Sequence, residues 1–176
     1  MIAHCIRDNV EALRQGSRLL AGLSAERYTQ RTPACFNSSA GGHLRHVIEH
    51  YLGFLQGTET NAGEIDYEAR ARDPLIESDP GYAAAQLDAI GERLTRIAEN
   101  RTLRVRVEAM PAHNEPAWGA STVVRELEFL LSHTVHHYAL IGVICQLAGH
   151  TLPKDFGMAP STLRHLKAQS VVSCAR

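Results

Sequence analysis

Residues 121–148 read STVVRELEFLLSHTVHHYALIGVICQLA, and this stretch decides the fold. Apolar side chains recur along it at helical spacing and form a broad stripe, made of Leu127, Leu130, Leu131, Val135, Leu140, Ile141, Ile144 and Leu147. Gly149 follows at once, in a position that a helix-ending glycine prefers. The pattern predicts one long helix whose wide apolar face packs against other helices.

Three other stretches show apolar residues at helical spacing. They are residues 3–22, a stretch from Ser38 or Ser39 as N-cap to about Leu55, and residues 80–99. Gly57 follows the second stretch as a helix-ending glycine, and Asp79 precedes the third as its cap. With a short helix from Pro160 to about Gln169, the sequence predicts an all-α four-helix bundle, a single domain over residues 1–176.

The connections are predicted to be uneven in length. Residues 58–79 are acidic and polar and read mostly as loop, a long crossover between helices. In residues 102–110, Leu103, Val105 and Val107 alternate with charged residues, which is typical of a strand. A short β-hairpin with the segment around Ala117 and Trp118 is therefore expected between the third and fourth long helices.

Composition and charge exclude several classes of protein. The chain has 18 Lys and Arg against 19 Asp and Glu, with no basic patch typical of nucleic-acid binding. No apolar run approaches the roughly 20 residues of a membrane span, so a cytoplasmic protein is expected. The four cysteines form no CxxC pair and are expected to be reduced, although Cys5 and Cys174 near the two ends could meet.

Histidines are the chemically distinctive residues of this chain. Six of the ten fall in two clusters on predicted helices, His43, His46 and His50 in the first and His133, His136 and His137 in the second. Residues i and i+4 of a helix lie within about 40° of one another, so His46/His50 and His133/His137 are each paired on one face. Imidazoles from two facing helices would make a site for a divalent metal ion.

The spacing leaves several ligand sets open. His133 can pair with His136 as well as His137, and His43, His46 and His50 can all share one face. Buried histidines are also satisfied by carbonyls or carboxylates without any metal. Glu49 and Glu126 are candidate partners for the second ring nitrogen of a metal-bound histidine, or else solvated surface charges.

The stretches SSAGGHLRHVIEHYLGFLQG and RELEFLLSHTVHHYALIGVI resemble the DinB/YfiT-like superfamily of bacterial metal-binding four-helix bundles. The resemblance implies one ligand from the second helix and two from a later HxxxH, which fall on His46, His133 and His137. Zn or Ni is the ion that we expect, with His43, His50 and His136 as supporting or substrate-facing residues. Ala139 departs from the HxxxHxE motif of related iron enzymes.

The same resemblance implies a function: a metal-dependent, thiol-dependent S-transferase or a metal-assisted hydrolase acting on a small molecule, such as a low-molecular-weight thiol. Glu49 and His136 are the nearest candidates for its general base. The alternatives are a non-catalytic, stress-related metal-binding bundle and a helical dimer whose histidines are satisfied polar core residues. A metal-facing cavity lined by two or more of Arg70, Arg72 and Arg125 would favour the enzyme, whereas solvated arginines, the commoner case for each alone, would favour the binding protein.

The oligomeric state is the last expectation. The apolar stripe of residues 121–148 is wide enough to cover both a bundle core and a dimer seam. Twofold dimers are the commonest assemblies of soluble proteins, so a homodimer is expected.

Overall fold

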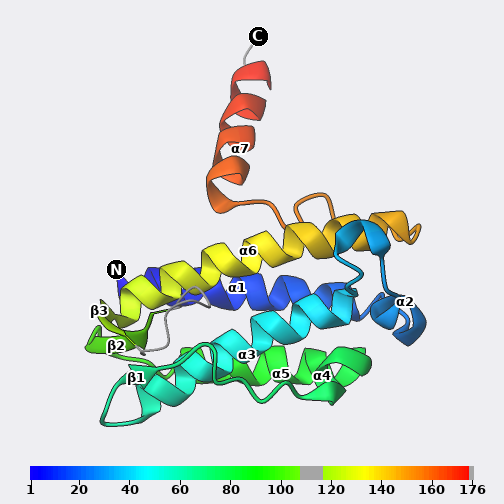
Figure 1. The fold of residues 1–176 in the computed structure, drawn as a ribbon. Coiled ribbons are helices and arrows are strands. Elements are labelled where there is room, and N and C mark those ends of the chain that lie inside the picture. The colour runs from blue at the N-terminus through cyan, green and yellow to red at the C-terminus, as the bar shows by residue number, and fades with distance from the viewer. Residues whose placement is uncertain (108–116, 175–176) are drawn as a thin grey trace.

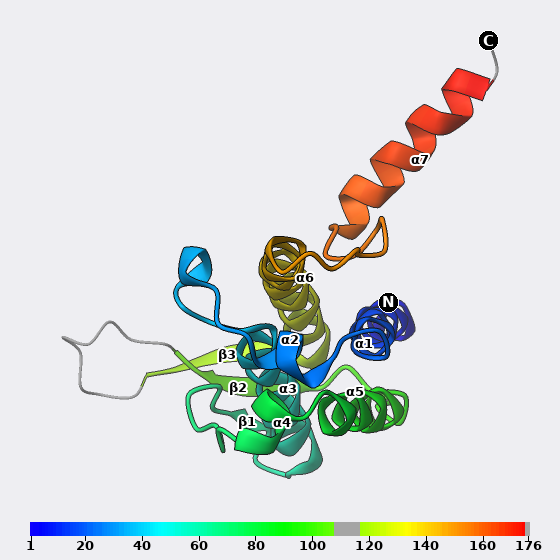
Figure 2. The same cartoon turned by 90° about the vertical axis from the view of Figure 1, so that its right-hand side faces the viewer.

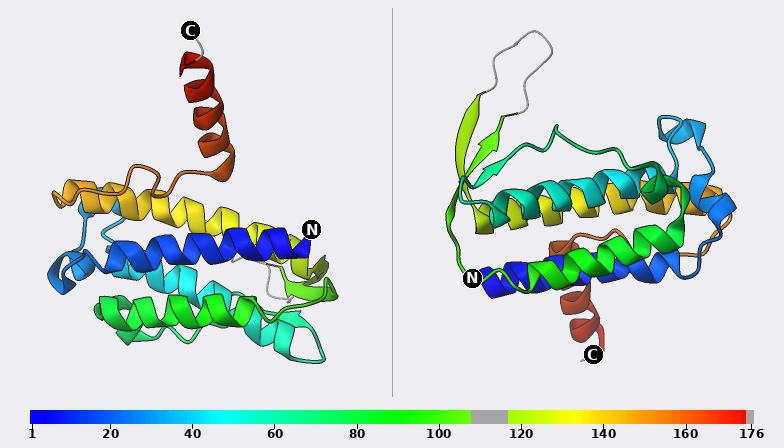
Figure 3. Two further views of the ribbon diagram at one scale, coloured as in Figure 1. Left: turned by 180° about the vertical axis from the view of Figure 1, so that it is seen from behind. Right: turned by 90° about the horizontal axis from the view of Figure 1, so that it is seen from below.

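A computed structural model describes residues 1–107 and 117–174, with side-chain environments up to residue 169 (Figure 1). Its body is a bundle of four long helices: α1 (Ile2–Leu20), α3 (Ala40–Glu59), α5 (Pro80–Leu94) and α6 (Val123–Leu147). α1 packs against α5 and α6, and α3 packs against the same two helices (Figure 3). The predicted four-helix bundle is confirmed, and the two histidine-bearing helices, α3 and α6, are direct neighbours.

Capping side chains begin three of these helices. Ser39 is the N-cap of α3, and its hydroxyl accepts a hydrogen bond of 3.0 Å from the Gly42 N–H. The Asp79 carboxylate accepts from two N–H groups at the start of α5, and the Thr122 hydroxyl accepts from the Arg125 N–H at the start of α6. Of the two serines that the sequence left open, Ser39 is therefore the cap.

Two predicted helix ends are wrong. Gly57 does not end α3, which continues to Glu59. It lies instead where strand β1 (Glu64–Ile65) crosses the helix, and a Cβ at this position would stand 2.5 Å from Ile65 Cγ1. The third long helix ends at Leu94 rather than residue 99, because the chain turns there toward the sheet.

A three-stranded sheet closes one end of the bundle (Figure 1). Strands β2 (Thr102–Arg106) and β3 (Trp118–Thr122) pair antiparallel, with Leu103 opposite Ser121, so the predicted hairpin is confirmed. Met110, at the end of the predicted first strand, lies outside the described residues. β1 adds a parallel strand beside β2, which the sequence did not predict because two residues are too few to show a period.

The remaining elements are short or stand apart. α2 (Ala25–Thr29) and the 3-10 turn η1 (Pro33–Cys35) join α1 to α3, and α4 (Pro74–Ser78) interrupts the crossover predicted as mostly loop. α7 (Pro160–Cys174) is longer than predicted and projects away from the bundle (Figure 2). No helix in the described ranges is both long and apolar enough to cross a membrane.

A single apolar core fills the bundle and extends to the sheet. Tyr28, Tyr51, Phe54 and Tyr138 are among its largest fully buried side chains. Three cysteines, Cys5, Cys35 and Cys145, are buried free thiols, as expected, whereas the side chain of Cys174 lies outside the described part.

The glycines of α3 and α5 provide a test of this packing. Gly57→Ala is expected to lower the free energy of unfolding by about 1–3 kcal/mol, because the new methyl group overlaps β1. Gly91→Ala in α5 is the matched control: nothing lies within 4 Å of its Cβ position, so it is expected to gain about 0.5–1 kcal/mol from helix propensity. Urea unfolding measures both. Equal effects of the two substitutions would contradict the close approach of β1 to α3.

Candidate metal centre

Five imidazole rings meet where α3 packs against α6. The centroid of the His46 ring lies 4.3 Å from that of His50, 4.9 Å from that of His133 and 4.6 Å from that of His137. His43, one turn before His46, has its Nδ1 3.0 Å from Nδ1 of His137. The exposed His136 is outside this group and touches only the edge of the His137 ring.

The nitrogen atoms at the centre have the spacing of ligands to one ion. Nε2 of His133 lies 3.2 Å from Nε2 of His46 and 3.0 Å from Nε2 of His137. Two nitrogens bound about 2.1 Å from a shared ion lie about 3.0 Å apart at a right angle and about 3.4 Å apart at the tetrahedral angle. A second combination, His46, His50 and His133, offers ligand atoms within 4.8 Å of one another.

Hydrogen bonding alone leaves this cluster incomplete. A ring nitrogen carries either one N–H or one lone pair, yet Nε2 of His133 faces two other ring nitrogens. Nδ1 of His133 and Nε2 of His43 are buried without a hydrogen-bond partner among the described residues. Buried polar groups are normally paired, and a cation would resolve the conflict at Nε2 of His133, because it would accept the lone pairs that cannot pair with one another. The donor set therefore fits a divalent metal ion that binds imidazole.

The rings are held in the neutral form that binds metal. Burial, followed by the effect of neighbouring imidazoles, lowers the pKa of His46 to about 2, of His137 to about 3 and of His133 to about 4. Burial also lowers the pKa of His50. Protons therefore do not compete for these nitrogens near neutral pH.

A buried hydrogen-bond network behind the rings sets the register of the two helices. The Asn9 amide on α1 donates to the carbonyl of Leu127 at 2.9 Å, and the Tyr51 hydroxyl donates to Asn9 Oδ1 at 2.7 Å. The Thr134 hydroxyl lies 3.1 Å from the Tyr51 hydroxyl. Because Tyr51 follows His50 and Thr134 follows His133, this network holds the two helices at the histidines.

A cavity of about 700 Å³ opens beside the cluster. His46, His50 and His133 line it, whereas His137 lies behind them and does not. Four arginines line its other walls: Arg70, Arg72, Arg106 and Arg125. The three arginines that the sequence singled out thus converge on the metal-facing cavity. The sequence did not single out Arg106 as a cavity residue, because a charged residue that alternates with apolar ones on a predicted strand is expected simply to face outward.

The four arginines differ in their partners. Arg106 pairs with Asp66 at 2.7 Å and with Glu68 at 3.5 Å. Arg70 donates to Nδ1 of His46, which leaves the ring proton on Nε2 in the ion-free protein. Arg70 also forms an ion pair with the buried Glu49, whose Oε2 lies 4.0 Å away.

Arg72 and Arg125 are the cavity's unpaired cations, and both side chains line it while remaining exposed to solvent. Neither guanidinium makes a hydrogen bond or an ion pair within the described residues. Arg72 has a φ of +53°, a backbone conformation uncommon outside glycine. Glu49 holds this segment in place, since its Oε1 accepts the Asp73 N–H at 3.0 Å.

The acidic residues have other roles than those expected. Glu49 is buried but does not line the cavity. The exposed His136, the other candidate for the general base, does not line it either, so neither side chain lies where a general base would have to be. Glu126 does line the cavity and is not a solvated charge. Its carboxylate accepts hydrogen bonds from the hydroxyls of Tyr67 at 2.8 Å and Ser121 at 2.5 Å rather than from a histidine.

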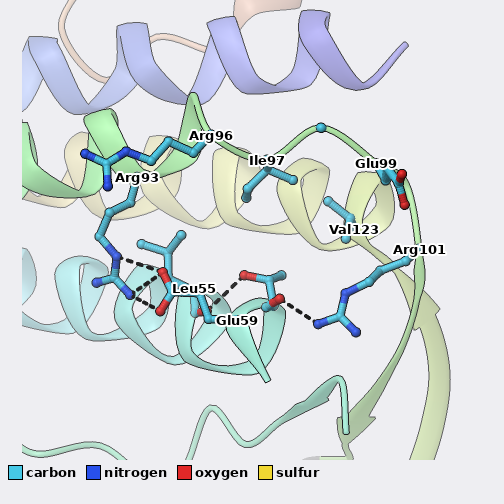
Figure 4. Close-up of a pocket in the computed structure, with 10 residues that line it drawn as sticks. Leu55, Glu59, Arg93, Arg96, Ile97, Glu99, Arg101 and Val123 are labelled. Atoms are coloured by element: carbon cyan, nitrogen blue, oxygen red, sulfur yellow. Dashed lines mark hydrogen bonds and ion pairs between the residues drawn. The ribbon is translucent and has the colours of Figure 1, made fainter. Parts of the chain in front are cut away.

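A second cavity, of about 510 Å³, lies between the end of α3 and the end of α5 (Figure 4). Its arginines have structural partners: Arg93 binds Glu59 through both carboxylate oxygens, and Arg101 donates to the carbonyls that end α3. Among the residues that the structure describes, no histidine or cysteine lines this cavity. The candidate metal-binding residues therefore lie at the histidine cluster and not at this second cavity.

The histidine pKa values predict how stability depends on pH in the absence of metal. An unfolded chain has histidine pKa values near 6.5, so between about pH 6.5 and pH 4 it binds more protons than the folded protein. The free energy of unfolding is expected to fall on acidification by up to about 1.4 kcal/mol per pH unit for each such histidine. Urea unfolding in EDTA from pH 4.5 to 7 measures this slope. His133→Gln is expected to lower the slope by the share of one histidine, up to about 1.4 kcal/mol per pH unit, because His46 and His137 keep theirs. An undiminished slope in His133→Gln would contradict the assignment.

Comparisons with known proteins agree with this description. The protein called FK506-binding protein 5 of Rhizopus delemar is 32% identical over 110 residues, which are 60% of this chain but only 28% of that relative. This chain thus spans less than a third of the relative's length. No solved structure matches. The DinB family model matches residues 1–161, which include all four bundle helices and both histidine clusters, and the chain therefore belongs to the DinB family.

Proposed function

We propose that this protein is a metal-dependent enzyme that acts on a small anionic molecule. His46, His133 and His137 hold a divalent ion, Zn or Ni, and a low-molecular-weight thiol is the substrate. The reaction is a thiol-dependent S-transfer or a metal-assisted hydrolysis. The observation that carries the proposal is that three histidines of the cluster, His46, His50 and His133, line a single cavity together with four arginines.

The arginines support a substrate with acidic groups. Guanidinium groups stay charged at every physiological pH and bind carboxylates and phosphates through paired hydrogen bonds. Arg70 and Arg106 have acidic neighbours within the protein, whereas Arg72 and Arg125 have none among the described residues. In the proposal, Arg72 and Arg125 bind the acidic groups of the substrate and thereby orient its reacting atom toward the histidines.

The chemistry follows from the donor set. When bound, the ion lowers the pKa of a thiol or of water and so supplies a nucleophile at neutral pH. Glu126 is the buried carboxylate of the cavity wall and is proposed to accept the released proton. The hydroxyls of Tyr67 and Ser121 orient it.

The alternative, a non-catalytic metal-binding bundle, needs the histidines but no substrate site. A cavity of about 700 Å³ next to the ligands, with two unpaired arginines in the described wall, has no role in that alternative. The arrangement therefore favours the enzyme.

Metal content is the first test. Purified protein without a histidine tag is expected to contain about one divalent ion per chain, and His46→Ala and His133→Ala are expected to lose most of it. Elemental analysis and circular dichroism on the same samples separate loss of metal from loss of fold. A metal-free parent, even after incubation with Zn²⁺ and Ni²⁺, would contradict the proposal.

Binding of an anionic thiol is the second test. Mercaptosuccinate carries a thiol and two carboxylates, and calorimetric titration measures its affinity for the metal-loaded protein. Arg72→Gln and Arg125→Gln are each expected to weaken it about 10-fold or more, since each removes a charge-assisted hydrogen bond. 2-Mercaptoethanol, which lacks carboxylates, is expected to bind all variants alike.

Arg96→Gln is the matched control for this test. Arg96 lines the second cavity (Figure 4), so mercaptosuccinate affinity is expected to be unchanged. Equal losses in all three arginine variants would indicate a general effect of charge and would contradict a substrate site at Arg72 and Arg125.

A further inference from the structure

We propose that Glu49 is a positioning residue of the substrate site: it holds residues 70–73 of the crossover against α3 so that Arg72 lines the cavity. This inference rests on the proposed function and deepens it, because it explains how the chain places one of the two cations that bind the substrate. Glu49 itself does not line the cavity. It therefore acts through the arginine and not on the substrate.

Glu49 is a buried carboxylate whose partners come from the crossover. Its side chain is only 3% exposed and lies on α3. Its Oε1 accepts a hydrogen bond of 3.0 Å from the Asp73 N–H, and its Oε2 lies 4.0 Å from Nη1 of Arg70. Burying a carboxylate is costly unless it is paired. The burial of Glu49 thus depends on the crossover lying against α3.

The two contacts of Glu49 flank Arg72 in the sequence. Arg70 comes two residues before it and Asp73 directly after it. Arg72 has a φ of +53°, and such a backbone conformation persists outside glycine only where neighbouring contacts impose it. Within the described residues, two of the polar contacts that join residues 70–73 to α3 end on Glu49. Glu49 therefore holds both sides of Arg72 and fixes the position from which its side chain lines the cavity.

Arg125, the other unpaired cation, is placed by a different part of the fold. It lies in the first turn of α6, where its N–H donates to the Thr122 hydroxyl at 3.2 Å. Its position thus follows from the bundle and not from the crossover. A change at Glu49 is expected to remove the contribution of Arg72 to substrate binding and to leave that of Arg125 in place.

Calorimetric titration of mercaptosuccinate into the metal-loaded full chain tests this inference. Glu49→Leu removes both contacts and is expected to weaken binding about 10-fold, as loss of the Arg72 charge does. Glu49→Gln keeps an oxygen that accepts the Asp73 N–H but no charge for Arg70, so a loss of about 3-fold is expected. 2-Mercaptoethanol is expected to bind both variants like the parent. Elemental analysis and circular dichroism verify the ion and the fold, and Glu49→Gln keeps the test valid if Glu49→Leu fails to fold.

Combined variants separate a positioning role from a general structural one. Because Glu49 acts through Arg72, Glu49→Leu with Arg72→Gln is expected to bind mercaptosuccinate no more weakly than Arg72→Gln alone. Glu49→Leu with Arg125→Gln is expected to lose about 100-fold, since these two changes are independent. Glu77→Gln is the matched control: it breaks another ion pair between α3 and the crossover, that of Arg45 with Glu77, away from the cavity lining, and parental affinity is expected.

The outcomes distinguish this inference from the proposed function. Parental affinity in both Glu49 variants, with Arg72→Gln still weakened, would overturn the positioning role and leave the proposed substrate site intact. Additive losses from Glu49→Leu and Arg72→Gln, or loss of the ion from both Glu49 variants, would also overturn the positioning role. Parental affinity in Arg72→Gln and Arg125→Gln would overturn the proposed substrate site and this inference with it.

Discussion

The contact between α3 and α6 is the constraint on which the rest of the structure depends, because it brings five imidazole rings together in one interface, two of them buried and three half-buried. Each ring nitrogen has a single hydrogen-bonding site, and burying such groups without partners is costly. Nε2 of His133 stands within 3.2 Å of two others, so the rings cannot all satisfy one another. A cation bound at this point would pair with these ring nitrogens and so stabilise the interface.

The interface is kept rigid by groups that have no chemical role. The amide of Asn9, the hydroxyl of Tyr51 and the hydroxyl of Thr134 form a buried network across α1, α3 and α6, directly behind the rings. A fully paired polar network specifies one register, because any sliding of a helix would leave several buried groups unpaired. The spacing of the candidate metal ligands is thereby set by the protein fold itself.

Three of the four arginines that line the cavity lie outside the bundle helices. The crossover brings Arg70 and Arg72, and the sheet brings Arg106, to the same cavity that the bundle lines with histidines. Glu49 joins the two parts, because it lies on α3 and accepts the Asp73 N–H of the crossover. The bundle thus carries the candidate metal ligands and Arg125, whereas the crossover and the sheet carry the other three arginines of the cavity.

The sequence by itself determined the four bundle helices, the cap at Asp79 and the histidine pairs, and it narrowed the cap of α3 to Ser38 or Ser39, because these depend on local spacing along one helix. Only the tertiary structure decided which rings meet, why Gly57 lies inside α3, and that Arg106 shares a cavity with Arg125. Such contacts join segments far apart in the chain, and local periodicity carries no information on which faces will pack together. His50 illustrates both cases. The sequence predicted that it shares a helix face with His46, whereas only the structure shows that its ring lies beside that of His133.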